Sequence, residues 1–454
     1  MLIMKSQYAD SQIFAYICDV VFNVFLEISF KLEFCDDNLI HIVSDGKEIR
    51  MAADLFDVVE SEKHSNLSLK SVNWDSRSIG DIKLINPFLP VLFGKPEAQF
   101  SSNVISIGFD ILGTIFFMLS RYEEKISSVR DIHNRFPGVE SIAYKEGFLD
   151  RPIVNEYIEV LWFAMKSLWP RLERKLHNPS IRVTCDVDAP YEESIQSPVK
   201  LLRDISRDFI KKKQFKDIGR KTKNYYASRR NDYSLDICDN FNWYMDACEI
   251  KGRQASFYFI PAHSAGRVDG YYEILEPRIL TLIKRISHRG HELGVHSSYN
   301  TYNDPDQLLH ERNLLIEACR KVGVEANISG NRQHYLRWDS AQTPSHLNKA
   351  GYKYDTSGAY ADVAGFRYGT SWSFPMWDWQ SMSALSLQQI PLVLMECSVI
   401  ADRYMGLGYS DEALDKMLDY KKNSMAYGGT FTLLWHNNHF GTDKDKAFFK
   451  ELIQ

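Results

Sequence analysis

IRVTCDVDAP, residues 181–190, is an apolar, β-branched run that ends in two aspartates one residue apart and a proline. Side chains alternate in direction along a strand, so Asp186 and Asp188 should point the same way. Two carboxylates at such a short distance repel each other unless a cation or a proton lies between them. The stretch therefore predicts a strand whose carboxyl end carries a candidate cation site.

Downstream of this stretch, strand-like apolar runs alternate with helical segments such as 306–322. Such alternation is typical of a parallel sheet with helical crossovers. We expect an α/β fold, a distorted and incomplete (β/α) barrel of about seven strands, over residues 179–454. The expected strands are 181–187, 255–260, 292–296, 326–330, 352–357, 388–395 and 430–436.

Residues 1–178 predict a smaller α+β domain whose role the sequence does not show. The apolar segment 13–30 contains Asp19 and Glu27, which favours an amphipathic core helix leading into a strand over a signal anchor. Residues 32–45 predict two paired strands around an Asp-Asp-Asn turn. Two buried helices are expected, at 109–124 and at 154–170, where Pro170 ends the second.

The net charge is −5, so the sequence lacks the basic character of a nucleic-acid-binding protein, and we expect no nucleic-acid partner. One basic run, 211–223, lies in a long segment (191–254) that we interpret as a solvated helical excursion, with a clamp for an anionic substrate as the alternative. Seven scattered cysteines without a CxxC pair indicate reduced thiols in a cytoplasmic protein. Because the sequence has no uninterrupted apolar span of about 18–20 residues, we also expect no stable membrane insertion. The oligomeric state is not readable.

Polar side chains follow several of the expected strands, at the ends where parallel α/β folds carry their chemistry. Carboxylates and imidazoles from different strands should therefore meet at one mouth and form an Asp/His metal centre with a histidine left over. The residues at these ends are Asp186, Asp188, His296, Arg332, His334, Tyr335, Arg337, Asp355, His436 and His439.

The ordered set TCDVD (184–188), HSSYN (296–300), RQHYLR (332–337) and LLWH (433–436) resembles the polysaccharide deacetylase domain, carbohydrate esterase family four. The resemblance covers 181–454 and implies a distorted (β/α) barrel, a divalent metal, most often zinc, and removal of acetyl groups from N-acetylated sugars. FFMLSRYEE (116–124) and RPIVNEY (151–157) resemble the region that precedes this domain in a bacterial subgroup, and imply no activity.

This resemblance implies a role for each matching residue. Asp186 would be the general base and Asp188 a metal ligand, with Val187 inserted where the family has adjacent aspartates. His296 would be a second ligand. The next ligand position holds Asn300, a poor zinc ligand, and His334 is the other candidate. Arg332, with Arg337 in reserve, would orient Asp186, and the last motif makes His436 the general acid.

For substrate binding the sequence offers Tyr335, Arg337, Asp355 and Trp372. Trp372 belongs to a tryptophan-rich stretch, 369–380, which is either a wall for sugar rings or a packing cluster. Glu396 and Asp402, near the end of the sixth expected strand, either support the site or cap a turn, and we expect caps.

Together these features predict a metal-dependent, most naturally zinc-dependent, hydrolase that removes acetyl groups from an N-acetylated sugar or a precursor of surface polysaccharide. One alternative is a carbohydrate-binding protein with a degenerate site, because the second histidine of the motif is missing. The other is a glycosyltransferase that uses DVD as a metal-binding DxD motif, which would leave His296 and His436 without a role.

Overall fold

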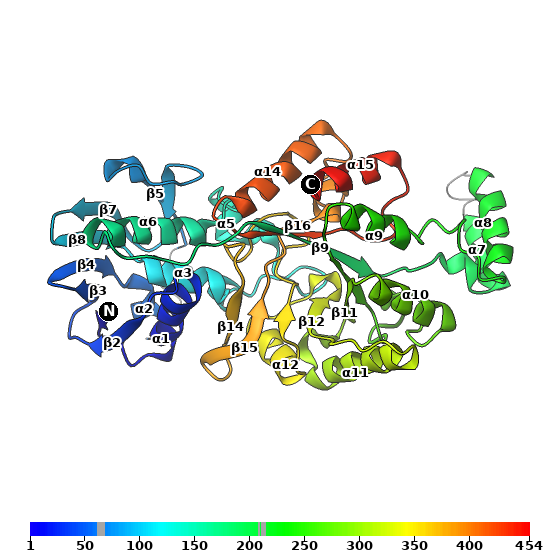
Figure 1. Cartoon of the computed structure of the whole chain (residues 1–454), viewed down its shortest axis with the longest axis horizontal. Coiled ribbons are helices and arrows are strands. Elements are labelled where there is room, and N and C mark those ends of the chain that lie inside the picture. The colour runs from blue at the N-terminus through cyan, green and yellow to red at the C-terminus, as the bar shows by residue number, and fades with distance from the viewer. Residues whose placement is uncertain (61–68, 208, 210–214) are drawn as a thin grey trace.

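The computed structural model describes residues 1–60, 69–207, 209 and 215–454. Two sheets lie one after the other along the longest axis of the molecule (Figure 1). A six-stranded sheet is built from residues 2–109 and a nine-stranded sheet from residues 180–434. Beyond the nine-stranded sheet, α7 (Pro198–Arg207) and α8 (Phe215–Ser228) project from the body (Figure 1). The predicted basic run 211–223 thus falls partly on α8 and partly outside the described residues.

The six-stranded sheet has the order β2-β1-β3-β4-β8-β7. The predicted pairing of two strands within 32–45 is wrong, because β1 lies between β2 and β3 and pairs with both. The helix at 12–25 provides the crossover that a parallel β1–β2 pair needs. The strands are β1 (Leu2–Ser6), β2 (Phe30–Phe34), β3 (Leu39–Ser44), β4 (Lys47–Ala52), β7 (Gly94–Phe100) and β8 (Val104–Phe109), and β5 (Val72–Asp75) and β6 (Phe88–Val91) form a separate pair.

The predicted helix at 109–124 is divided in two. Every residue of α3 is buried, as its apolar composition predicts. The helix ends because Arg121 takes a left-handed conformation, with φ 54°. The helices of this part are α1 (Gln12–Cys18, continued as a π-helix to Phe25), α2 (Asp54–Glu60), α3 (Ile111–Leu119), α4 (Tyr122–Ile126), α5 (Ile142–Lys145) and α6 (Ile153–Leu168).

The nine-stranded sheet has the order β14-β15-β13-β12-β11-β10-β9-β17-β16, and all of its pairs except β14–β15 are parallel. The sheet is curled into an incomplete barrel that is left open between its edge strands, β14 and β16. Its strands are β9 (Ser180–Val187), β10 (Ala255–Phe259), β11 (Glu292–Ser297), β12 (Gly330–Gln333), β13 (Tyr354–Asp355), β14 (Phe374–Asp378), β15 (Ser383–Gln389), β16 (Leu394–Met395) and β17 (Thr430–Leu434). The helices around it are α9 (Phe241–Glu249), α10 (Pro277–His288), α11 (Pro305–Lys321), α12 (Thr343–Lys349), α13 (Glu396–Ile400), α14 (Asp411–Met425) and α15 (Asp443–Leu452).

The sheet therefore has nine strands where the sequence predicts about seven. The strand expected at 388–395 is interrupted at Pro391, which has no N–H to donate, so β15 ends before it and β16 begins after it. The strand expected at 326–330 begins only at Gly330. β14 was missed because it contains Pro375, which an edge strand tolerates.

One continuous hydrophobic core joins the two sheets. The tryptophan-rich stretch lies at this junction: Trp379 donates its indole N–H to the Ser120 carbonyl (3.0 Å), and Trp377 packs edge-on against Phe116 (5.8 Å between ring centres). The domain boundary near residue 178 stays a prediction. All seven cysteines carry free thiols.

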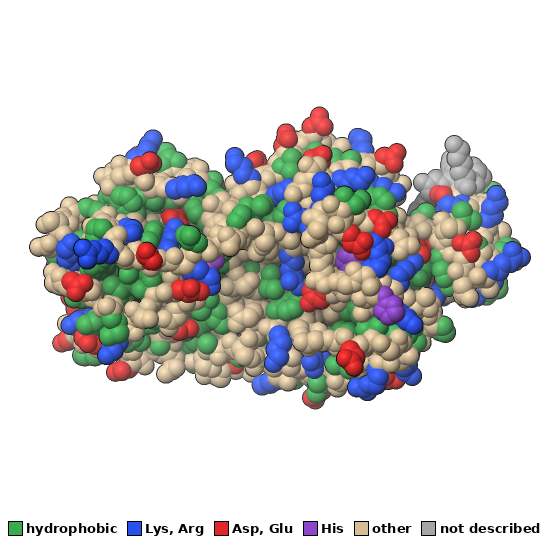
Figure 2. Space-filling model, in the orientation of Figure 1, with side chains coloured by type: hydrophobic (Ala, Val, Ile, Leu, Met, Phe, Trp, Pro, Cys, Tyr) green, Lys and Arg blue, Asp and Glu red, His purple; other side chains and the backbone are tan. Residues whose placement is uncertain are grey.

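The visible face of the molecule carries Lys and Arg mixed with Asp and Glu over all its parts (Figure 2). Within the described ranges, every helix is too short or too polar to cross a bilayer.

Candidate active site

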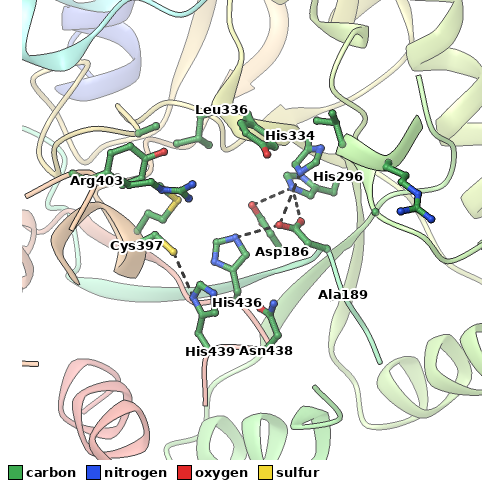
Figure 3. Close-up of a pocket in the computed structure, with 18 of the residues that line it drawn as sticks. Asp186, Ala189, His296, His334, Leu336, Cys397, Arg403, His436, Asn438 and His439 are labelled. Carbon is green, nitrogen blue, oxygen red and sulfur yellow. Dashed lines mark hydrogen bonds and ion pairs between the residues drawn. The ribbon is translucent and has the colours of Figure 1, made fainter. Parts of the chain in front are cut away.

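Five strand ends of the barrel deliver their polar side chains into one cavity of about 320 Å³ (Figure 3). The alternation along β9 directs Asp186 to this mouth, with Asp188 just beyond the strand. β11 contributes His296, the turn after β12 contributes His334, and the turn after β17 contributes His436. The parallel register places these positions side by side, since His296 on β11 pairs with Arg332 on β12.

Three of these side chains form a compact group of donors. One ligand atom from each of Asp188, His296 and His334 lies within 4.8 Å of the other two. His296 Nε2 is 3.2 Å from Asp188 Oδ1, and His334 Nε2 is 3.9 Å from Asp188 Oδ2. Ligands of a tetrahedral zinc lie about 3.3 Å apart when each bond is about 2.0–2.1 Å. The group is therefore spaced to accept a divalent cation.

The second nitrogen of each imidazole is fixed by a partner outside the group. His296 Nδ1 donates to the Arg332 carbonyl (2.9 Å), which aims Nε2 at Asp188. His334 Nδ1 is held by the fully buried Asp269 (2.8 Å). Such outer hydrogen bonds orient metal-binding histidines. Asp188 Oδ1 is buried and lacks a hydrogen-bond partner among the described residues, as expected for an atom that binds a cation.

Electrostatics favour a charged carboxylate at Asp188. Burial raises the pKa of this carboxyl, but the imidazoles of His296, His334 and His436 lower it by more, and the net pKa is far below the ordinary value. For His296 the opposite holds: burial lowers its pKa, while Asp186 and Asp188 raise it to a value above normal. Asp188 and His296 together therefore favour an additional positive charge between them, which either a proton or a metal ion supplies.

Asp186 is buried and lies between Arg332 and His296, whose Nε2 is 3.5 Å from Asp186 Oδ2. The Arg332 Nη1 lies 3.3 Å and 3.5 Å from the two Asp186 oxygens. The guanidinium is itself completely buried and donates to the hydroxyls of Thr184 (3.1 Å) and Thr356 (3.0 Å). This frame holds the carboxylate in place at the cavity, the arrangement that a general base requires.

His436 lies on the other side of Asp188, with Nε2 3.8 Å from Asp188 Oδ2. Its Nδ1 lies 2.5 Å from Glu396 Oε1. Burial lowers the pKa of His436, but Glu396 and Asp188 raise it more strongly, to about 10. His436 therefore carries a proton that Nε2 can present to the cavity. The expectation that Glu396 caps a turn is wrong: it is the charged partner of this imidazole.

Glu396 also binds His439, and Cys397 approaches both. His439 Nδ1 is 2.7 Å from Glu396 Oε1, and Cys397 Sγ is 3.4 Å from the same nitrogen. These four side chains include two carboxylate–imidazole separations of 2.5 and 2.7 Å, which are hydrogen-bond lengths. They leave no room for an ion between the donors, so this second group is a hydrogen-bonded support for His436.

Asn300, the other candidate for the third ligand, lies outside the donor group. Its amide nitrogen donates to the Ser264 carbonyl (3.1 Å), and its oxygen accepts from Arg337 (3.0 Å). Arg337 is equally occupied, since it also donates to the carbonyls of His133 and Tyr299. Neither Asn300 nor Arg337 lines the cavity. Among the predicted substrate residues, Tyr335 does line it.

Asp355 and Trp372 also have structural roles instead of the predicted contact with substrate. Asp355 is fully buried and accepts hydrogen bonds from Asn331 (2.8 Å) and Ser357 (2.7 Å). Trp372 stacks on His177 with 3.8 Å between ring centres, and its N–H donates to the Tyr427 carbonyl. Both lie outside the residues that line the cavity, so the tryptophan-rich stretch is a packing cluster.

The cavity includes side chains that the sequence did not indicate, among them Arg135, Arg267, Arg403 and Tyr404. Arg135 comes from the part of the chain before the barrel, and its Nη1 donates to the Tyr335 carbonyl (2.7 Å). Tyr335 itself has φ 61°, a left-handed conformation that lets its ring turn toward His334, 4.7 Å away. The first part of the chain thus shapes the mouth of the barrel.

Comparison with known proteins gives a match for the first part of the chain: residues 1–170 fit a family described only as a family of unknown function (DUF7033). No curated protein matches the chain.

Three solved structures are similar to it. One is described as a polysaccharide deacetylase from Mycobacterium smegmatis, with 16% identity, a TM-score of 0.40 and coverage of 62% of this chain and 84% of that chain. Another is the allantoinase Puue (11%, TM-score 0.36, coverage 61% and 83%). The third is described as a polysaccharide deacetylase from Pseudomonas aeruginosa PAO1 (11%, TM-score 0.35, coverage 61% and 84%). Such identities and TM-scores are too low to transfer an activity or a residue's role to this chain.

Proposed function

We propose that this protein is a metal-dependent hydrolase that removes acetyl groups from an N-acetylated sugar or a polysaccharide precursor. The observation that carries the proposal is the convergence of Asp188, His296 and His334 beside a second, arginine-bound carboxylate, Asp186. His436 lies on the opposite side with a proton to give. Hydrolysis of an amide needs this combination: a cation site, a base and an acid.

The residues divide the chemistry between them. A divalent cation bound to Asp188, His296 and His334 would polarise the acetamido carbonyl and lower the pKa of a water molecule to about 7. Asp186, held in position by Arg332, accepts the proton of the attacking water. His436 Nε2 protonates the departing amine, which is otherwise a poor leaving group. Glu396 holds His436 in the orientation that presents Nε2.

Zinc fits this donor set best. Two imidazoles and one carboxylate, with space left for water or substrate, are the usual ligands of catalytic zinc. Of the two candidates for the third ligand, we assign His334 rather than Asn300; the assignment is supported by the 3.9 Å between His334 Nε2 and Asp188 Oδ2. The alternative of a degenerate binding protein was based on the missing histidine and loses its main support. The glycosyltransferase alternative gives His296, His334 and His436 no role.

Bound metal is the first test of this proposal. We expect about one ion per chain in the purified wild type and almost none in Asp188→Ala or His334→Ala, because each loses one of three protein ligands. Asn300→Ala is the matched control and should keep the metal, since Asn300 binds Ser264 and Arg337 instead. Mass spectrometry of the native protein gives the stoichiometry. If the wild type stays metal-free after incubation with zinc, nickel or cobalt, the proposal fails.

A second prediction concerns the outer partner of His334. Asp269→Asn should weaken zinc binding by about 10- to 100-fold, the usual cost of losing the carboxylate that orients a histidine ligand. Competition with a chelating dye measures the affinity. Asp378→Asn, also a buried aspartate but one that caps the turn at Gln380, should bind zinc like the wild type. Equal affinities in both variants would show that Asp269 does not orient the ligand.

A further inference from the structure

A second cavity of about 670 Å³ adjoins the site. Residues 139–150, which precede the barrel, form one of its walls, and residues 362–364 and α14 form others. The two cavities share Arg403 and Tyr404 as lining residues, so they meet at this pair. Each volume lies in the range of about 300–1,000 Å³ that ligand sites occupy. Together they form one cleft that continues well past the acetamido-binding position.

Arg403 lies at the boundary of the two cavities and, among the described residues, has no carboxylate partner; Lys416, deeper in the second cavity, packs over the Tyr420 ring at 5.5 Å. The other two arginines at the site are paired: Arg135 with Asp131 at 2.7 Å, and Arg267 with Glu193 at 3.9 Å. Arg403 is exposed and only packs over the Tyr404 ring, 4.9 Å from its centre; within the described ranges, no carboxylate reaches it. In Figure 3 Arg403 lies across the cavity from His296 and His334.

Four carboxylates line the cleft: three are engaged elsewhere, and the fourth, the exposed Asp150 of the second cavity, is accompanied there by Lys416. Asp186 is bound to Arg332, and Asp188 belongs to the cation site. In the second cavity, the carboxylate of Asp362 accepts the backbone N–H groups of Gly138 (2.9 Å) and Val139 (3.2 Å). With a divalent cation in place, the boundary between the two cavities is therefore positive, and a negative group bound there would meet an unpaired guanidinium.

The second cavity also offers aromatic surface. Tyr144 is 48% exposed, which is high for such a large ring, and Tyr404 and the more buried Tyr420 also line the cavity. Flat rings with a polar edge suit the faces and hydroxyls of sugar rings. A small anion would make no contact with these aromatic rings, whereas a chain of sugars could pack its ring faces against them.

We propose that the substrate is an acidic glycan that spans both cavities, with an anionic group, a carboxylate or a phosphate, bound to Arg403. This inference rests on the proposed function for the divalent cation at Asp188 and for the place of the acetamido group beside it. The part of the chain before the barrel then acts as half of the binding cleft, through residues 139–150.

The test is binding to the zinc-loaded full chain by calorimetry, with three probes that share N-acetylglucosamine. Chitotetraose is neutral, a hyaluronan tetrasaccharide carries carboxylates, and N-acetylglucosamine 1-phosphate carries a phosphate. We expect one acidic probe to bind about 10- to 100-fold more tightly than chitotetraose, the value of a charge-assisted hydrogen bond. Arg403→Gln should abolish that preference. Arg77→Gln, at another exposed arginine, should retain it.

The extent of the cleft is tested by Val139→Trp. Val139 is 39% exposed and lines the second cavity, so the larger ring should block it without entering the core. Both tetrasaccharides should then bind at least about 10-fold more weakly, and the monosaccharide phosphate unchanged. Val129→Trp, 44% exposed and outside both cavities, is the control.

The outcomes separate this inference from the proposed function. An acidic preference that depends on Arg403 supports the inference, and the preferred probe identifies the anion. Equal binding of all probes, a preference that survives Arg403→Gln, or tetrasaccharide binding that survives Val139→Trp overturns it. Release of acetate is measured separately: acidic glycans that bind through Arg403 but are never deacetylated would contradict the proposed function alone.

Discussion

Asp186→Asn is expected to lower kcat for acetate release by about 10²- to 10⁴-fold, the range that a general base contributes. The asparagine side chain fits the space of the aspartate but cannot accept the proton of water. Metal content should stay at the wild-type level, because Asp186 is bound to Arg332 and the three-donor group does not include it. The measurement is acetate released from N-acetylated sugar oligomers, together with bound metal.

This prediction differs from the one for Asp188. Asp188→Ala should lose metal and activity together, whereas Asp186→Asn should lose activity alone. Asp378→Asn is again the control, since it makes the same chemical change at a buried position away from the cavity. If Asp186→Asn also loses its metal, Asp186 is a ligand. If its kcat is unchanged, another group is the base.

The sequence identified the site residues whose positions follow from the geometry of the strands. The alternation of β9 places Asp186 and Asp188, and parallel strands bring His296, Arg332 and His436 to the same edge. Asp186, His296 and His436 could be found because each follows an apolar run, and Arg332 because it begins the RQHYLR motif. His334 could be named only as one of two candidates, because the choice depends on where Nε2 points after the turn at Tyr335.

Residues that depend on tertiary contacts were missed. Asp269 lies in a short loop, GRVDG, and only the fold brings it 2.8 Å from His334. Glu396 was expected to cap a turn because only the fold brings the imidazole of His436 to 2.5 Å from its carboxylate. Arg403 follows no periodic pattern at all. Trp372, by contrast, was predicted to bind substrate but lies outside the cavity. Its aromatic neighbours suggested a sugar-binding surface, but aromatic residues pack equally well in a core.

The junction between the two sheets carries the largest predicted effect on stability. Glu124, from the first part of the chain, accepts both Nε (2.9 Å) and Nη2 (2.7 Å) of Arg367 in the barrel. Arg121 donates to the same carboxylate (2.9 Å), and all three side chains are at most 3% exposed. Burial raises the pKa of Glu124, but Arg367 and Arg121 lower it more, to about 2.

We expect Arg367→Met to lower the free energy of unfolding by about 3–5 kcal/mol, because it leaves a buried carboxylate with one cation instead of two. The urea midpoint, followed by circular dichroism, measures the loss. Lys145→Met is the control: its pair with Glu140 is exposed (53% and 42%), so it should cost at most about 1 kcal/mol.

The double variant Glu124→Gln with Arg367→Met separates the cost of an unpaired charge from the cost of lost packing. If the uncompensated Glu124 is what destabilises Arg367→Met, removing its charge as well should restore part of the stability, and the double variant should lose less than the two single changes added together. A loss equal to that sum would mean that the two side chains act independently. The contact between the first part of the chain and the barrel would then depend on its aromatic core, and not on this ion pair.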